Sequence, residues 1–101
     1  MVTFSDRVLI PAHVLIRHMD GESVLLNLET EKYFGLDATG TRMWEVVTQS
    51  ISIEAAYVTL LQEFDVQPEQ LRANLGELIG HLIQNGLLKL SSADVGRLPA
   101  V

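Results

Sequence analysis

The dipeptide Asp20-Gly21 constrains the fold of this chain most, because it separates two segments that have the character of β-strands. Asp-Gly between two such segments is a strong signal for a tight β-hairpin. Residues 13–19, HVLIRHM, mix apolar and polar side chains, and residues 22–29, ESVLLNLE, alternate with a period of two. After a second polar turn at 30–31, the segment KYFGL at 32–36 predicts a third strand. The sequence therefore predicts a three-stranded antiparallel meander.

Beyond these strands the pattern changes to the period of α-helices. Asp37, Ser52 and Pro68 are residues typical of helix starts, and Asn85-Gly86 is typical of a helix end. The expected helices run over about residues 38–49, 53–64 and 68–84. We therefore predict an α+β fold in which the three-stranded sheet precedes three helices.

A length of 101 residues predicts one domain, which we place at residues 13–90, between a lead-in at 1–12 and a flexible tail at 91–101. The absence of cysteine excludes disulfides and thiolate chemistry and is compatible with the cytosol. The N-terminus lacks the features of a signal peptide, and no apolar run approaches the ~18 residues that cross a bilayer. A cytoplasmic protein with no membrane partner is expected.

The formal net charge of −6, with only seven Lys and Arg residues, bears on the class of partner. A nucleic-acid-binding protein needs a basic face to neutralise phosphates. The charge therefore argues against nucleic acid and favours a neutral or basic partner such as a peptide.

The polar residues give no pattern typical of catalysis or metal binding. His13 and His18 are five residues apart on a predicted strand, so they point to opposite faces, and His81 is far from both in sequence. Surface histidines are the favoured interpretation over a zinc site. The serines lie at helix caps and in the tail, without a base beside them. We expect no enzyme activity, no metal and no cofactor.

The third strand, Lys32 to Leu36, is an edge of the predicted meander. An edge strand presents unpaired backbone groups, and this one carries a single charge and no proline to discourage pairing. Alternation places Phe34 and Leu36 on one face and Tyr33 and Gly35 on the other. Phe34 is expected in the core, while the strand backbone is suited to pairing with an extended peptide.

The third helix carries two glycines, Gly76 and Gly80, on one side of a leucine stripe. The predicted core stripe consists of Leu71, Leu75, Leu78 and Leu82. Glycine inside a helix costs ~1 kcal/mol relative to alanine, so its presence here needs a reason. Either another element packs closely against the glycines, or they leave a shallow trough, flanked by isoleucines, in which another chain can lie.

Two long segments carry a resemblance to a known family. VLLNLETEKYFGLDATGTRMWEVV and QEFDVQPEQLRANLGELIGHLIQNGLL resemble the PqqD-like proteins, also called recognition elements of ribosomally synthesised and post-translationally modified peptides. The resemblance extends over about Val14 to Leu90 and is carried by LLNLETEKYFGLDATG, Trp44, FDVQPEQL and the terminal NGLL, in that order and spacing. It implies a winged-helix-like fold, which agrees with the pattern of strands and helices.

The resemblance also implies a function. PqqD-like proteins are not enzymes; they bind the leader part of a precursor peptide as a strand added to their third strand, in a cleft against the third helix. They deliver it to a maturation enzyme, either a leader peptidase or a radical-SAM enzyme. YFGLDATG looks closer to the broader group than to the quinone-pathway proteins, so a lasso-peptide or other modified-peptide pathway is expected. Together with the helical wheel, the resemblance predicts peptide contacts by Glu31, Lys32, Tyr33, Phe34, Gly35, Leu36, Arg72, Leu75, Gly76, Ile79 and Ile83.

The alternative is a winged-helix DNA-binding regulator, because the order of helices and strands allows it. Such a protein should carry basic residues on its third helix, yet Arg72 is the only Lys or Arg between Pro68 and Gln84. Leader-peptide binding is therefore the favoured prediction.

Overall fold

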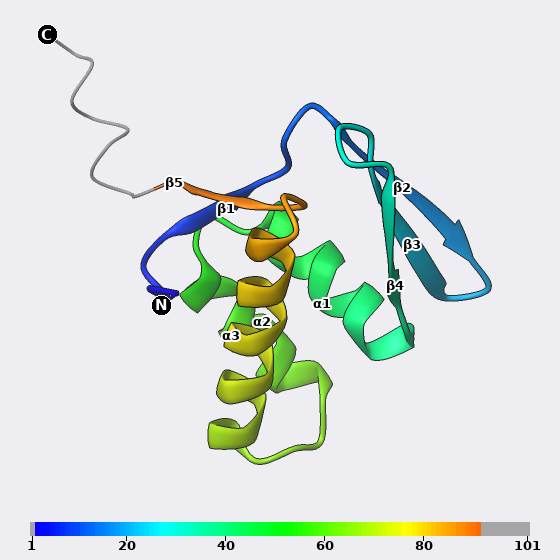
Figure 1. Ribbon diagram of the computed structural model, residues 1–101. Coiled ribbons are helices and arrows are strands. Elements are labelled where there is room, and N and C mark those ends of the chain that lie inside the picture. Colours follow the sequence, from blue (N-terminus) through cyan, green and yellow to red (C-terminus); the bar gives the residue numbers. More distant parts are fainter. Residues whose placement is uncertain (1, 92–101) are drawn as a thin grey trace, which may run out of the picture.

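The computed structural model describes residues 2–91 and confirms the predicted α+β class, with a three-stranded antiparallel sheet followed by three helices (Figure 1). The elements in chain order are β1 (Arg7–Leu9), β2 (Val14–Met19), β3 (Glu22–Asn27), β4 (Lys32–Leu36), α1 (Ala38–Gln49), α2 (Ile53–Glu63), α3 (Pro68–Gln84) and β5 (Lys89–Ser91). The prediction of a flexible tail falls on residues 92–101, which lie outside the described part; Ser91 belongs to β5.

The main sheet has the order β2-β3-β4, with both neighbouring pairs antiparallel. Asp20 and Gly21 both have positive φ angles, 53° and 83°, as the two central residues of a tight hairpin turn require. The register places Leu25 opposite Ile16 on β2 and opposite Phe34 on β4. These three side chains share the inner face of the sheet, against which the helices pack.

The helix ends are closed by the residues that the sequence indicates. The Asp37 carboxylate accepts a hydrogen bond from the Gly40 amide (2.8 Å), and the Ser52 hydroxyl accepts one from the Ala55 amide (3.1 Å). At the end of α3, Gly86 has a φ of 70°, and the Leu87 amide donates to the Leu82 carbonyl (2.8 Å). This is the left-handed helix end that Asn85-Gly86 predicts.

The lead-in contains a strand that the sequence analysis did not predict. β1 pairs antiparallel with β5, so residues from the two ends of the described chain form a second, two-stranded sheet beside α3 (Figure 1). Val8 is buried, and the carbonyls of Phe4 and Asp6 accept hydrogen bonds from the amides of Glu54 and Ile53 (both 2.8 Å). The lead-in therefore satisfies two of the amides that the first turn of α2 leaves free.

The core lies between the inner face of the main sheet and the three helices. It includes fully buried side chains from the sheet and from each helix, among them Leu25, Val47, Leu60 and Leu75. Two buried hydroxyls, those of Ser23 and Thr41, form a hydrogen bond of 2.7 Å that joins β3 to α1. Because a buried polar group needs a partner, this bond helps to fix the sheet on the first helix.

Candidate functional site

The outer edge of β4 is free within residues 2–91, because β4 pairs only with β3. Its side chains alternate as predicted: Leu36 is buried and Phe34 is half-buried on the inner face, whereas Tyr33 is 75 % exposed and Gly35 is exposed on the outer face. Lys32, at the start of the strand, is exposed. The strand is thus anchored on one side and presents both backbone and side chains on the other.

The turn that leads into β4 is held by Asn27, which sequence reasoning did not single out. Asn27 is only 3 % exposed. Its side-chain oxygen, Oδ1, accepts hydrogen bonds from the amides of Glu29 (2.9 Å) and Thr30 (3.3 Å). Its side-chain nitrogen, Nδ2, donates a hydrogen bond to the carbonyl of Asn85 (2.9 Å). Glu31, whose φ is 62°, completes the turn. Asn27 therefore connects the start of β4 to the end of α3. The sequence contained a signal for the burial of Asn27, because a residue two positions after the buried Leu25 points to the same face of the sheet.

A hollow of about 350 Å³ lies at this junction, between the start of β4 and the end of α3. One edge of it carries His13, whose Nε2 donates to the Gly86 carbonyl (3.0 Å) and whose Nδ1 lies 3.6 Å from Oε2 of Glu29. The residues around the hollow are His13, Asn27, Glu29, Thr30, Lys32, Gln84, Asn85 and Gly86. Lys32 is the residue of β4 and Gln84 the residue of α3 that border the hollow, so it lies where β4 begins and α3 ends.

The predicted trough around Gly76 on α3 is already occupied. A Cβ atom on Gly76 would lie 3.6 Å from Cε1 of Phe4, so the ring of the lead-in residue covers the glycine. Arg72 lies on the same flank: its guanidinium carbon is 4.0 Å from the centre of the Phe4 ring, and its Nη2 is 3.1 Å from Oε1 of Glu54. The close-packing interpretation of this glycine therefore holds, and the open-trough interpretation does not fit the structure.

The remaining predicted residues of α3 lie in or beside the core. Leu75 and Ile79 are fully buried, and Ile83 is half-buried. The buried stripe contains Ile79 in place of the predicted Leu78, which is half-buried. A helical wheel alone could not place this boundary, because the lead-in and α2 decide which flank of α3 is covered.

The opposite flank of α3 is the one turned toward the main sheet. At ~100° per residue, Leu78 and Asn85 lie together on the side of the buried stripe away from Arg72. The hydrogen bond between Asn27 and the Asn85 carbonyl ties this flank to the turn before β4. The half-buried Leu78 and the exposed Asn85, which follows the last residue of α3, are on this flank, whereas Gly76 is on the flank that Phe4 covers.

The shortest ion pair within residues 2–91 lies away from β4. Arg42 on α1 donates two hydrogen bonds to the Glu63 carboxylate (2.7 and 2.8 Å), and these bonds hold the pKa of Glu63 below its usual value and raise the pKa of Arg42. Within residues 2–91, no group of three or more His, Asp or Glu residues could hold a metal ion. No helix in the same part of the chain is both long and apolar enough to cross a membrane.

Comparisons with known proteins agree with this architecture. The model of the family described as coenzyme PQQ synthesis protein D (PqqD) matches residues 22–88, and the chain belongs to this family. The solved structure of "TbiB1 in Complex with the TbiA(beta) Leader Peptide" is similar, with a TM-score of 0.74 and 32% identity over 79% of this chain and 93% of that one. A search of curated proteins gives no match.

A second solved structure, "Lasso peptide synthetase B1 complexed with the leader peptide", shares the fold. It has a TM-score of 0.74 and 18% identity, and the match covers 82% of this chain and 98% of that one. The resemblance drawn from the sequence is confirmed, and the matched residues include β3, β4 and all three helices.

Proposed function

We propose that this protein binds the leader region of a ribosomally synthesised precursor peptide as a strand added to β4. The observation that carries the proposal is the free edge of β4, which begins at the hollow beside the end of α3, in a chain 32% identical to a protein solved with a leader peptide. An added strand gains affinity from backbone hydrogen bonds and specificity from the side chains on its two faces.

The direct contacts of this site come from β4 and the turn before it, Glu31 to Leu36. Among the predicted residues of α3, Leu75 and Ile79 do not touch the peptide in this proposal, because they are buried. They hold the helix against the core. Arg72 and Gly76 lie on the flank of the helix that Phe4 covers, and the half-buried Ile83 packs against the core. The wall that the peptide touches is supplied by the other flank, at Leu78 and Asn85.

The protein acts by presenting the bound leader to a separate maturation enzyme and catalyses no step itself. A leader peptidase of a lasso-peptide pathway is the favoured partner over a radical-SAM enzyme, since the chain shares its fold with a lasso peptide synthetase B1 protein. We place this work in the cytoplasm, where ribosomes make precursor peptides.

DNA binding is disfavoured by the electrostatics of α3. Arg72 is the only Lys or Arg of the helix, and it forms an ion pair with Glu54 and lies over the rings of Phe4 and Tyr57. A recognition helix needs free cations for phosphates and base edges.

A titration tests the proposal. The leader of the precursor encoded beside this gene, carrying a fluorescent label, is titrated with the protein, and a random DNA duplex of similar length serves as control, each at low and moderate salt. We expect saturable leader binding that moderate salt changes little and no saturable DNA binding. Saturable DNA binding that disappears with salt, with no leader binding, would overturn the proposal.

A further inference from the structure

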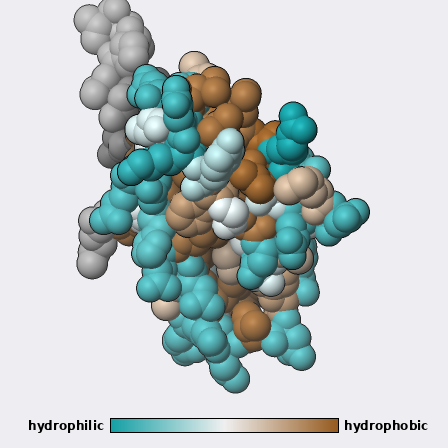
Figure 2. Space-filling view, turned by 45° about the vertical axis from the view of Figure 1, so that its right-hand side comes forward, coloured by the Kyte–Doolittle hydropathy of each residue, from teal (hydrophilic) through white to brown (hydrophobic). Residues whose placement is uncertain are grey.

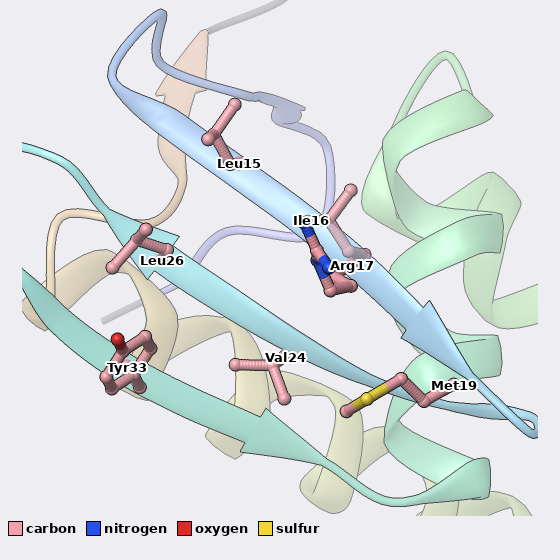
Figure 3. A pocket seen from close by; sticks show the side chains of 7 residues that line it. All are labelled: Leu15, Ile16, Arg17, Met19, Val24, Leu26 and Tyr33. Carbon is pink, nitrogen blue, oxygen red and sulfur yellow. The ribbon is translucent and has the colours of Figure 1, made fainter.

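The outer face of the main sheet, which points away from the helices, is mostly apolar. Its residues form two rows across the three strands: Leu15, Leu26 and Tyr33 in one, and Arg17, Val24 and Gly35 in the next. Figure 3 shows the first row side by side, with Met19 reaching toward Val24, and Figure 2 shows apolar side chains exposed between hydrophilic margins. Leu15 and Met19 are 54% and 51% exposed. The face contains a hollow of about 310 Å³.

Gly35 leaves a gap in the second row at the free edge of the sheet. Apart from Gly35 itself and its two chain neighbours, no residue of the described chain has an atom within 4 Å of the position that a Cβ on Gly35 would take. Its φ is not among the positive values that Gly21 and Gly86 adopt, so the backbone does not require glycine here. Glycine weakens a strand, and it often marks the close approach of another chain or a ligand.

On the basis of the proposed function, we infer that the leader carries a large apolar or aromatic side chain on the outer face, opposite Gly35. In an added strand, the residue opposite Gly35 must point to the same face as Gly35. Strands lie about 4.8 Å apart, so Val24 is about 10 Å from the peptide backbone, within reach of a long side chain that crosses the bare glycine. Such a side chain would pack on Val24 with Tyr33 at its flank.

The occupant of this gap is the leader because the gap opens onto the strand edge that the leader extends. Gly35 and Tyr33 belong to β4, so both rows end at the free edge of the sheet. A leader residue opposite Gly35 therefore continues the row begun by Arg17 and Val24. The neighbouring leader residues point the other way, toward Phe34 and α3. The protein thus contacts leader side chains on both faces of the sheet. The leader residue that packs on the outer face is adjacent in sequence to one that packs on the inner face.

The inference is tested by display of a library of random 12-residue peptides, selected for binding to the full chain and sequenced. For the wild-type protein we expect an alternating pattern with a large apolar residue at one outer position. Selection on the Gly35→Ile variant should reduce enrichment of large residues at that position at least tenfold, because the new side chain fills the gap. Selection on Phe34→Ala should instead change the preference at the adjacent, inner position.

The matched control is Gly80→Ile, which adds the same side chain to a glycine on α3 whose Cβ position, the backbone of the helix itself and the adjoining residues apart, also has no atom of the described chain within 4 Å. It should leave the selected peptides unchanged. Peptides that bind the wild type but show no large residue at the outer position would overturn the inference and leave the proposed function standing. An equal loss at every position with Gly35→Ile would also overturn it, since a local contact alters one position only.

Two further outcomes count against the inference. If the wild-type protein enriches no peptide at all, the proposed function fails and the inference with it. If the protein sediments as a dimer that Gly35→Ile dissociates, while the selected peptides stay the same, a second copy of the chain covers the outer face instead of the leader.

Discussion

The two edge strands of the main sheet, β2 and β4, both lack a partner on their outer side within residues 2–91, but their surroundings differ. The last three residues of β2, Arg17 to Met19, are all exposed and lead into the hairpin turn. β4 begins at the hollow beside the end of α3 and finishes with the buried Leu36. A peptide added to β4 would lie beside the end of α3, whereas a peptide added to β2 would lie at the opposite edge of the sheet.

The largest effect is expected from proline on the two edges. Gly35→Pro should lower leader affinity roughly a hundredfold or more, because proline removes a backbone donor and fixes the strand at the site of pairing. His18→Pro is the matched variant, because the two-residue turn makes Met19 and Glu22 a hydrogen-bonded pair, and alternation along the strands then points the amides of both His18 and Gly35 to the free edges of the sheet. It should leave the affinity within about twofold. Calorimetric titration measures the affinity, and circular dichroism verifies that both variants fold. Equal losses of leader affinity in the two variants would contradict the prediction that the leader pairs with β4 and not with β2.

A smaller effect is expected on the inner face, where Ile16 of β2 and Phe34 of β4 flank Leu25. Both side chains are half-buried and pack against the core, so Ile16→Ala and Phe34→Ala should each lower the free energy of unfolding by about 1–3 kcal/mol. Only Phe34→Ala should also weaken leader binding, by about thirtyfold, or about 2 kcal/mol. Urea unfolding and leader titration of both variants separate the two effects. A leader affinity that follows stability in both variants would contradict a specific role for Phe34.

The wall beside β4 is tested on the two flanks of α3. Leu78→Ser removes apolar surface from the flank turned toward the sheet and should weaken leader binding about tenfold. Gly76→Leu places a side chain where Phe4 packs 3.6 Å away, so it should lower stability through the lead-in and leave leader affinity nearly unchanged. Fluorescence titration and thermal unfolding report the two quantities. The reverse result, with Gly76→Leu blocking the leader, would return the contact to the flank that the helical wheel first indicated.

β4 could be predicted from the sequence in full, whereas the contact surface of α3 could not. The bounds of β4 and the faces of Tyr33 and Phe34 follow from a turn signal and a period of two, both of which are local. Which flank of α3 stays uncovered depends on the position of Phe4 and on the pairing of β1 with β5. Phe4 is more than seventy positions away from the end of α3 in the chain. Three residues of lead-in strand carry too little pattern to be recognised before the partner strand is known. Asn27 was missed for a related reason, because its partner Asn85 lies on another element.

The smallest effect is expected from charge. Glu29 and Glu31 lie in the turn before β4, and Glu22 follows the hairpin turn beside β2. Exposed ion pairs contribute about 0.2–1 kcal/mol each, and salt screens them. A basic leader should therefore associate about two- to threefold more slowly with the double variant Glu29→Gln/Glu31→Gln, with little change in its dissociation rate, while Glu22→Gln should have no effect. Stopped-flow binding at about 50 and about 500 mM salt measures both rates.

Strand pairing and apolar contacts should preserve most of the equilibrium affinity over this range. A collapse of affinity at the higher salt would mean that charge, rather than the free edge of β4, holds the peptide.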